Sequence, residues 1–112
     1  MNPGHVLVIP KAHAALVEDL PPGAAGPILE AAKDIARALR TSGIRCEAVG
    51  FYLANGSSSG QEVFHVHLHL IPRWRGDGLG LRVRPDYGRI ADRQELDGLA
   101  VRIRAAVNRS VD

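Results

Sequence analysis

Three of the five histidines in this chain stand at alternate positions in one apolar run, residues 64–73. They are His65, His67 and His69, and single apolar residues separate them. This alternation predicts a β-strand, because side chains two residues apart in a strand point to the same face. Neighbouring imidazoles would then lie roughly 7 Å apart, given a rise of about 3.3 Å per residue. The opposite face, which would pack against a hydrophobic core, carries Phe64, Val66, Leu68 and Leu70.

Length and composition limit the class of protein. A chain of 112 residues, 46% apolar and 23% charged, suits one soluble globular domain over residues 1–112. No apolar run approaches the ~20 residues of a membrane span, and no signal-peptide layout is visible. The single cysteine, Cys46, excludes an internal disulfide, so we expect a reducing, cytoplasmic setting.

The charge distribution points weakly to phosphate-bearing ligands. Residues 73–93 contain six arginines against three aspartates, and such a stretch could attract phosphate groups or be an ordinary solvated loop. Aromatic residues make up only 4% of the chain, which argues against a nucleic-acid surface built on base stacking.

Hydrophobic periodicity predicts an α+β fold in which a small antiparallel sheet packs with helices. Residues 25–40 follow the spacing of an amphipathic helix, and Gly43 can cap its end. Residues 47–54 predict a strand that a glycine-rich loop joins to the histidine strand as a hairpin. Asp92 and Glu95 predict the start of a second helix. Weaker patterns predict a strand at 5–10, a short helix within 11–20 and an extended segment at 81–84.

The histidine row has three interpretations. A purely structural row is the weakest, because burying titratable rings costs stability unless the protein uses them. A zinc site is the second, but the histidine face continues as Val63 and Ile71 and offers no carboxylate. The third is nucleophilic catalysis at phosphorus, in which one neutral imidazole attacks and its neighbours hold protons or donate to phosphate oxygens.

The loop before the histidine strand can supply hydrogen-bond donors for a phosphate group. Asn55 and Gln61 carry side-chain amides, residues 57–59 are serines, and Gly56 and Gly60 favour accessible backbone N–H groups. Beside the histidine row, this loop favours phosphorus chemistry over metal binding.

These motifs resemble those of the histidine triad (HIT) superfamily. Residues 65–71 match its pattern, in which single apolar residues separate three histidines and two apolar residues follow the last histidine. Residues 3–11, Pro-Gly-His-Val-Leu-Val-Ile-Pro-Lys, are similar to its upstream strand, and residues 55–63 are similar to its phosphate loop. Residues 72–78 resemble the segment that follows the triad in bacterial members. The resemblance covers most of residues 3–80.

The resemblance implies a HIT-like fold and a nucleotide hydrolase or nucleotidyl transferase. The reaction would occur at the α-phosphate of nucleoside phosphoramidates or dinucleoside polyphosphates, through a nucleotidyl-histidine intermediate. By motif position His67 would be the nucleophile, His69 would contact the phosphate, and the carbonyl of His65 would orient the His67 ring. His5 would be the family's fourth histidine, next to His65 and the phosphate. The residues that bind phosphate or nucleotide would be Asn55, Gly60, Gln61, Val63 and His69.

The resemblance also implies partners. The family's chemistry requires no metal or other cofactor, its members are usually homodimers, and the ligand would be a small nucleotide rather than a membrane or a nucleic acid. Two alternatives stay open: a catalytically impaired nucleotide-binding or interaction module, and a histidine-rich metal-binding β-domain. We expect His13 to be a surface residue outside the site.

The sequence departs from the family pattern in three places. Ala54 stands where many members carry Asn or Gln, and the neighbouring Asn55 could replace it. Glu62 stands where a hydroxyl side chain often assists the leaving group, and its carboxylate would repel a polyphosphate. Family members normally carry several dozen residues before the Pro-Gly-His strand, whereas this sequence starts almost at that strand. We therefore expect N-terminal elements, and with them the base and ribose half of the pocket, to be missing from this chain.

Overall fold

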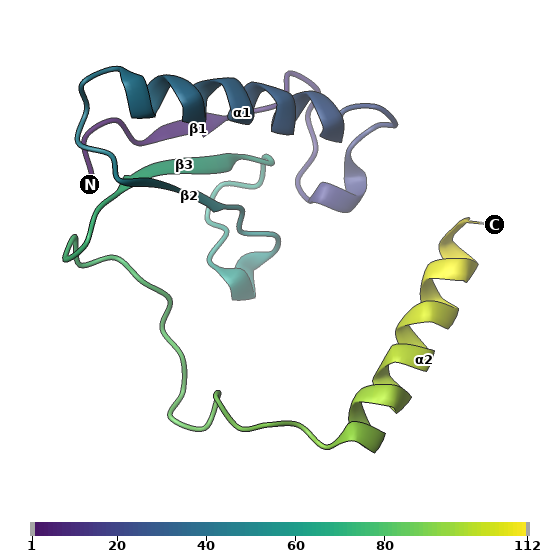
Figure 1. The fold of residues 1–112 in the computed structure, drawn as a ribbon. Helices are drawn as coiled ribbons and strands as arrows, with labels where there is room; N and C mark the ends of the chain where they lie inside the picture. The colour runs from purple at the N-terminus through teal and green to yellow at the C-terminus, as the bar shows by residue number, and fades with distance from the viewer. Residues whose placement is uncertain (1, 112) are drawn as a thin grey trace. The chain divides into compact units, whose positions relative to one another are not determined.

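Figure 1 shows the fold in a computed structural model, which describes residues 2–111. The chain forms two compact units, residues 1–79 and residues 80–112. The first unit holds a three-stranded antiparallel sheet and helix α1 (Ala25–Thr41), and the second holds helix α2 (Arg93–Val111). The predicted α+β fold class is confirmed. A single domain across residues 1–112 stays a prediction.

The sheet has the strand order β1-β3-β2, so the strand that follows the histidines is central. Its strands are β1 (Val6–Val8), β2 (Ala48–Tyr52) and β3 (Leu68–Arg73). Both outer strands run antiparallel to β3, which confirms the predicted hairpin between β2 and β3. Leu70 of β3 lies opposite Val6 on one side and Phe51 on the other, and its side chain is fully buried.

Helix α1 lies along the sheet (Figure 1) and builds the core of the first unit. The buried core residues are Val8, Ala14, Ile28, Ala32, Leu39, Val66, Leu68 and Leu70. The periodicity of α1 also places Leu29 on the buried face, but Leu29 is 60% exposed. It lies about 100° around the helix from Ile28, at the edge of the apolar stripe. The helix ends at Thr41, and Gly43 has the left-handed φ of 84° expected after a helix end.

The histidine strand is shorter than its sequence pattern predicts. Regular β3 begins at Leu68, so of the three alternating histidines only His69 lies within it. The reason is where the preceding backbone bonds: the N–H of Val66 donates to the carbonyl of Ala14 in a loop, at 2.8 Å, rather than to a neighbouring strand. The alternation of burial nevertheless holds from residue 65 to residue 73, so the predicted separation into a core face and a histidine face is correct there.

Several boundary predictions are wrong. The sequence alternation places Phe64 on the core face, but Phe64 is 53% exposed, because it precedes the segment in which burial alternates. The strand predicted at 5–10 is limited to β1, and the helix predicted within 11–20 is a single 3₁₀ turn at Val17–Asp19. Residues 81–84 form no strand.

A buried carboxylate closes the first unit after β3. The side chain of Asp77 is 2% exposed and accepts hydrogen bonds from Arg73 Nε at 2.6 Å and Arg73 Nη2 at 2.9 Å. It also accepts from the backbone N–H groups of Trp74 and Leu79 and from the Asn2 amide. The Arg73 guanidinium, followed by these other donors, holds the pKa of Asp77 well below its usual range. The network ties the N-terminal residues to the turn that follows the sheet.

The second unit consists of an irregular segment and helix α2. The predicted start is confirmed, since Asp92 Oδ2 accepts from the N–H of Glu95 at 3.4 Å. The apolar residues Leu96, Leu99 and Ile103 are between 43% and 64% exposed. Among the described residues of this unit, α2 is the only helix or strand.

Candidate active site

The histidine face of the sheet is the one that does not face α1. The side chains of Leu68 and Leu70 enter the core, and His67 and His69 point to the other side, where they are half-buried. Opposite His69 in the sheet are Leu7 of β1 and Tyr52 of β2. Because directly opposed residues share a face, these two side chains flank His69.

The contacts of His67 determine its tautomer. Its Nδ1 lies 2.8 Å from the backbone carbonyl oxygen of His65. A carbonyl can only accept a hydrogen bond, so Nδ1 of His67 carries the hydrogen. In the neutral ring Nε2 then has an unprotonated lone pair, which is the form of imidazole that can act as a nucleophile. The contact between this carbonyl and this ring, which the family resemblance implies, is present.

His69 forms a pair with His5. Nε2 of His5 lies 2.9 Å from Nδ1 of His69, and the ring of His67 stands edge-on to His69 with centroids 4.9 Å apart. The expectation that His5 lies next to His65 is therefore wrong. His5 comes directly before β1. The register that sets Leu7 opposite His69 also brings the His5 ring next to His69.

Partial burial, and after it the neighbouring histidines, lower the proton affinity of His69. Its pKa falls below the ordinary value of 6.5, first because the ring is partly buried and then because protonated His67 and His5 would repel its charge. We expect the imidazole C–H resonance of His69 to titrate below pH 6.5 in an NMR pH series, and to return to about 6.5 in the urea-unfolded chain. A midpoint at or above 6.5 in the folded protein would contradict this environment.

The neutral form of His69 also has a consequence for stability. The folded chain binds a proton on His69 less readily than the unfolded chain does. The free energy of unfolding therefore decreases as the pH falls below about 6.5. Above that pH both states hold a neutral ring, and the contribution of His69 to pH dependence vanishes.

His13 is exposed, as expected, but it unexpectedly contacts a histidine of the triad. Its Nδ1 lies 3.1 Å from Nδ1 of His65, and Nε2 of His65 lies 2.9 Å from the carbonyl oxygen of Pro10. The Pro10 carbonyl requires a hydrogen on Nε2 of His65, so in neutral rings His13 is the donor to His65. The loop after β1 thus fixes the ring of His65 by hydrogen bonds with the carbonyl of Pro10 and with His13. The carbonyl of His65 in turn accepts a hydrogen bond from His67, the candidate nucleophile. No periodicity relates His13 to His65; only the pairing of this loop with residues 65–66 brings them together.

The loop at residues 55–63 has the turn geometry that its glycines predict. Gly56 and Gly60 have positive φ angles of 105° and 99°, and Ser57–Ser59 form a 3₁₀ turn between them. Ala54, at the entrance, is only 6% exposed and belongs to the interior rather than to the loop surface. Glu62 is exposed.

Two side chains that we expect to bind phosphate, those of Gln61 and Asn55, form hydrogen bonds within the protein. Gln61 is 4% exposed; its Nε2 donates to the carbonyls of Ala15 and Val63, and its Oε1 accepts from the N–H of Gly56. The side chain of Gln61 therefore closes the loop instead of facing a ligand.

Asn55 is similarly engaged. Its Oδ1 accepts from the N–H of Val17 at 2.9 Å, and its Nδ2 donates to the carboxylate of Glu18. Asn55 therefore does not take the place of an amide at position 54. The backbone N–H of Glu18, and after it the hydrogen bond from the Asn55 amide, hold the pKa of the Glu18 carboxyl below its usual range.

Val63 meets the candidate nucleophile at a small pocket. A hollow of about 290 Å³ is lined by Leu7, Ile9, Val63, His65 and His67. Val63 is 63% exposed and contributes an apolar wall. Gly60 does not line this hollow; its N–H donates to the carbonyl of Ser57. Within residues 2–111, no group of three or more His, Cys, Asp and Glu side chains is arranged to hold a metal ion.

The sequence and structure match known proteins. Residues 1–76 match the HIT domain. This chain belongs to the HIT family. The HIT domain match lies within the first compact unit and contains every histidine described above.

Three similar proteins illustrate the relationship. Protein hit of Bacillus subtilis is 42% identical over 80 residues, which cover 69% of this chain and 53% of that protein. The adenosine 5′-monophosphoramidase of Saccharomyces cerevisiae is 38% identical over 80 residues, covering 71% of this chain and 47% of that protein. A crystal structure of a HIT family protein from Bacillus anthracis superposes with a TM-score of 0.80 at 33% identity, covering 93% of this chain and 73% of that one.

The curated relatives are longer than this chain. The chain spans between 53% and 61% of the length of five curated relatives that it matches in sequence. The described helices include none that is both long and apolar enough to cross a membrane.

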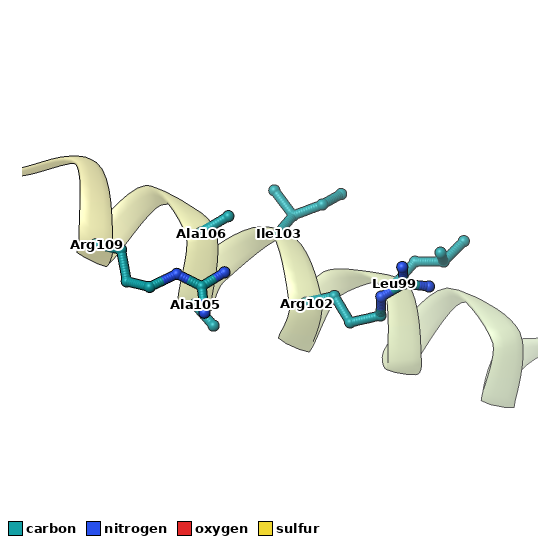
Figure 2. Close-up of a pocket in the computed structure, with 6 residues that line it drawn as sticks. All are labelled: Leu99, Arg102, Ile103, Ala105, Ala106 and Arg109. Atoms are coloured by element: carbon teal, nitrogen blue, oxygen red, sulfur yellow. The ribbon is translucent and has the colours of Figure 1, made fainter.

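A larger hollow lies outside the HIT domain match. It measures about 490 Å³ and is lined only by residues of helix α2, Leu99, Arg102, Ile103, Ala105, Ala106 and Arg109. Figure 2 shows these side chains leaving one helix in different directions, with Ile103 and Ala106 on the side away from Arg102. Without titratable groups other than arginine, this surface has no chemistry comparable to that of the histidine pocket.

Proposed function

We propose that this HIT family chain is a hydrolase or nucleotidyl transferase acting at the α-phosphate of nucleoside phosphoramidates or dinucleoside polyphosphates. The observation that carries the proposal is the 2.8 Å contact between Nδ1 of His67 and the carbonyl of His65. It leaves Nε2 unprotonated on a ring that lines the same apolar pocket as Val63 and Leu7. The similarity to a yeast adenosine 5′-monophosphoramidase supports the same substrate class.

The proposed reaction has two displacements at phosphorus. In the first, Nε2 of His67 forms a bond to the α-phosphorus while the bond from phosphorus to the leaving nitrogen or oxygen breaks, and the leaving group takes up a proton. In the second, water attacks the phosphorus and gives up a proton, which replaces the one that the neighbouring histidines passed to the leaving group; the bond to Nε2 breaks, and the nucleoside monophosphate leaves. An acceptor other than water would make the same enzyme a transferase.

The surrounding histidines suit this chemistry. When His67 is bonded to phosphorus its ring becomes positively charged, and the hydrogen bond from Nδ1 to the His65 carbonyl then strengthens. We assign the His5–His69 pair to the phosphate oxygens and to proton storage, since the ring of His69 adjoins His67 and His5 contacts His69. We further propose that the chemistry needs no metal or other cofactor, and that the protein works as a cytoplasmic homodimer.

The proposal is tested by the fate of adenosine phosphoramidate and a diadenosine polyphosphate mixed with the full chain. We expect AMP to accumulate from at least one of them, at a rate that chelators leave unchanged. AMP binding without turnover would instead favour a nucleotide-binding module. Turnover that chelators abolish and zinc restores would favour the metal-binding alternative.

A further inference from the structure

Tyr52 connects the histidine face to the 55–63 loop. It is the last residue of β2 and lies opposite His69 in the sheet, with the two ring centroids 6.1 Å apart. Its hydroxyl donates a hydrogen bond to the carbonyl of Ser59 at 2.5 Å. A Cβ built on Gly60 would come within 3.9 Å of the same hydroxyl, so Tyr52 meets the loop where the 3₁₀ turn ends.

The loop has few other ties to the rest of the protein. Both ends of the loop are hydrogen-bonded to residues 15–18. Gln61 donates to the carbonyl of Ala15, and Asn55 bonds to the N–H of Val17 and to the carboxylate of Glu18. The remaining hydrogen bonds of Ser57–Gly60 stay within the loop. Among the described residues, the hydroxyl of Tyr52 is therefore the one hydrogen-bonding group that joins this turn to the sheet.

Burial does not explain this tyrosine. Tyr52 is 42% exposed and is absent from the hydrophobic core, so its ring is not needed to fill the interior. What its position does provide is a fixed separation between the loop and His69. A phosphate held beside His67 and His69 would have the histidines on one side and the loop on the other, and small errors in such a separation are costly in catalysis.

We propose that Tyr52 is a positioning residue that holds the 55–63 loop at the correct distance from the histidine triad. The inference rests on the proposed function, because the loop and the triad must act on one phosphate group. Donors on a fixed loop stabilise the charge that develops on the phosphate oxygens most strongly in the transition state. Loss of the tether therefore affects the rate of the bound substrate more than its binding.

The experiment replaces Tyr52 with phenylalanine, which keeps the ring beside His69 and removes only the hydroxyl. Tyr87→Phe is the matched control, because Tyr87 is the other tyrosine, is 64% exposed and lies in the second unit. With adenosine phosphoramidate we expect Tyr52→Phe to lower kcat about tenfold and to change KM less than about twofold. Amide hydrogen exchange without substrate should become faster at residues 59–61 and stay unchanged in β3, while Tyr87→Phe matches the wild type in both measurements.

Each other result overturns the inference. Wild-type kcat and wild-type exchange in Tyr52→Phe would show that the hydroxyl holds nothing of importance. A raised KM with unchanged kcat would make Tyr52 a simple binding group, and faster exchange throughout β3 and α1 would show general destabilisation. If the wild type has no turnover at all, the proposed function fails, and the exchange of residues 59–61 alone then decides whether Tyr52 holds the loop.

Discussion

Replacing His67 with asparagine is expected to lower kcat for adenosine phosphoramidate hydrolysis at least about a thousandfold. Asparagine can still donate a hydrogen bond to the His65 carbonyl, but its amide has no basic lone pair to attack phosphorus. The variant should bind AMP with an affinity within about threefold of the wild type, because the pocket walls and the His5–His69 pair are unchanged. Chromatographic measurement of AMP release and calorimetric AMP titration give the two quantities.

The comparison with His69→Asn makes this result specific. His69 lies beside His67 and has a pKa below its usual value, so it is the next candidate for a neutral attacking ring. We expect His69→Asn to reduce the rate while still forming the covalent intermediate. If His67→Asn retained more than a tenth of wild-type kcat, the assignment of the nucleophile would be wrong.

Replacing Gln61 with leucine is expected to destabilise the first unit by about 2–4 kcal/mol. Leucine has a similar volume but cannot replace the three hydrogen bonds of this buried side chain. The N–H of Gly56 and the carbonyl of Ala15, both in partly buried residues, would each lose a partner. Urea unfolding followed by Trp74 fluorescence suits the measurement, because the single tryptophan lies in the same unit.

Gln94→Leu is the matched control for this prediction. Gln94 is the other glutamine, is exposed and lies in α2, so its replacement should change stability by less than about 0.5 kcal/mol. Equal effects of the two substitutions would show that Gln61 does not hold the loop. The site should respond as well, with kcat falling in Gln61→Leu because the same loop adjoins the histidines.

Hydrophobic periodicity in the sequence predicts the helix and the alternation of buried side chains, because both depend on residues close together in the chain. The apolar spacing of residues 25–40 identified α1, and from Val66 onward the alternation identified which side chains enter the core. The beginning of β3 could not be read in this way, because it depends on the hydrogen bond from Val66 to Ala14, more than fifty residues away. Periodicity reports how side chains alternate, not which backbone partner each N–H finds.

The candidate site shows the same division. The alternating histidines and the glycine loop were visible in the sequence, and the structure brings His67 and Val63 to one pocket. The pairing of His13 with His65 and of His5 with His69 depends on how β1 and the loop after it lie on β3. The burial of Gln61 could not be read from the sequence for a physical reason: an amide in a polar loop can face a ligand or close the loop, and both leave the same sequence pattern.

The most direct test of the account is to find where the nucleotide becomes attached. Wild-type protein mixed with adenosine phosphoramidate and quenched within the first turnover should carry one AMP group. Peptide mapping by mass spectrometry should place that group on His67, and His67→Asn should carry none. An adduct on His65, His69 or His5, or rapid turnover with no adduct at any quench time, would contradict attack by Nε2 of His67.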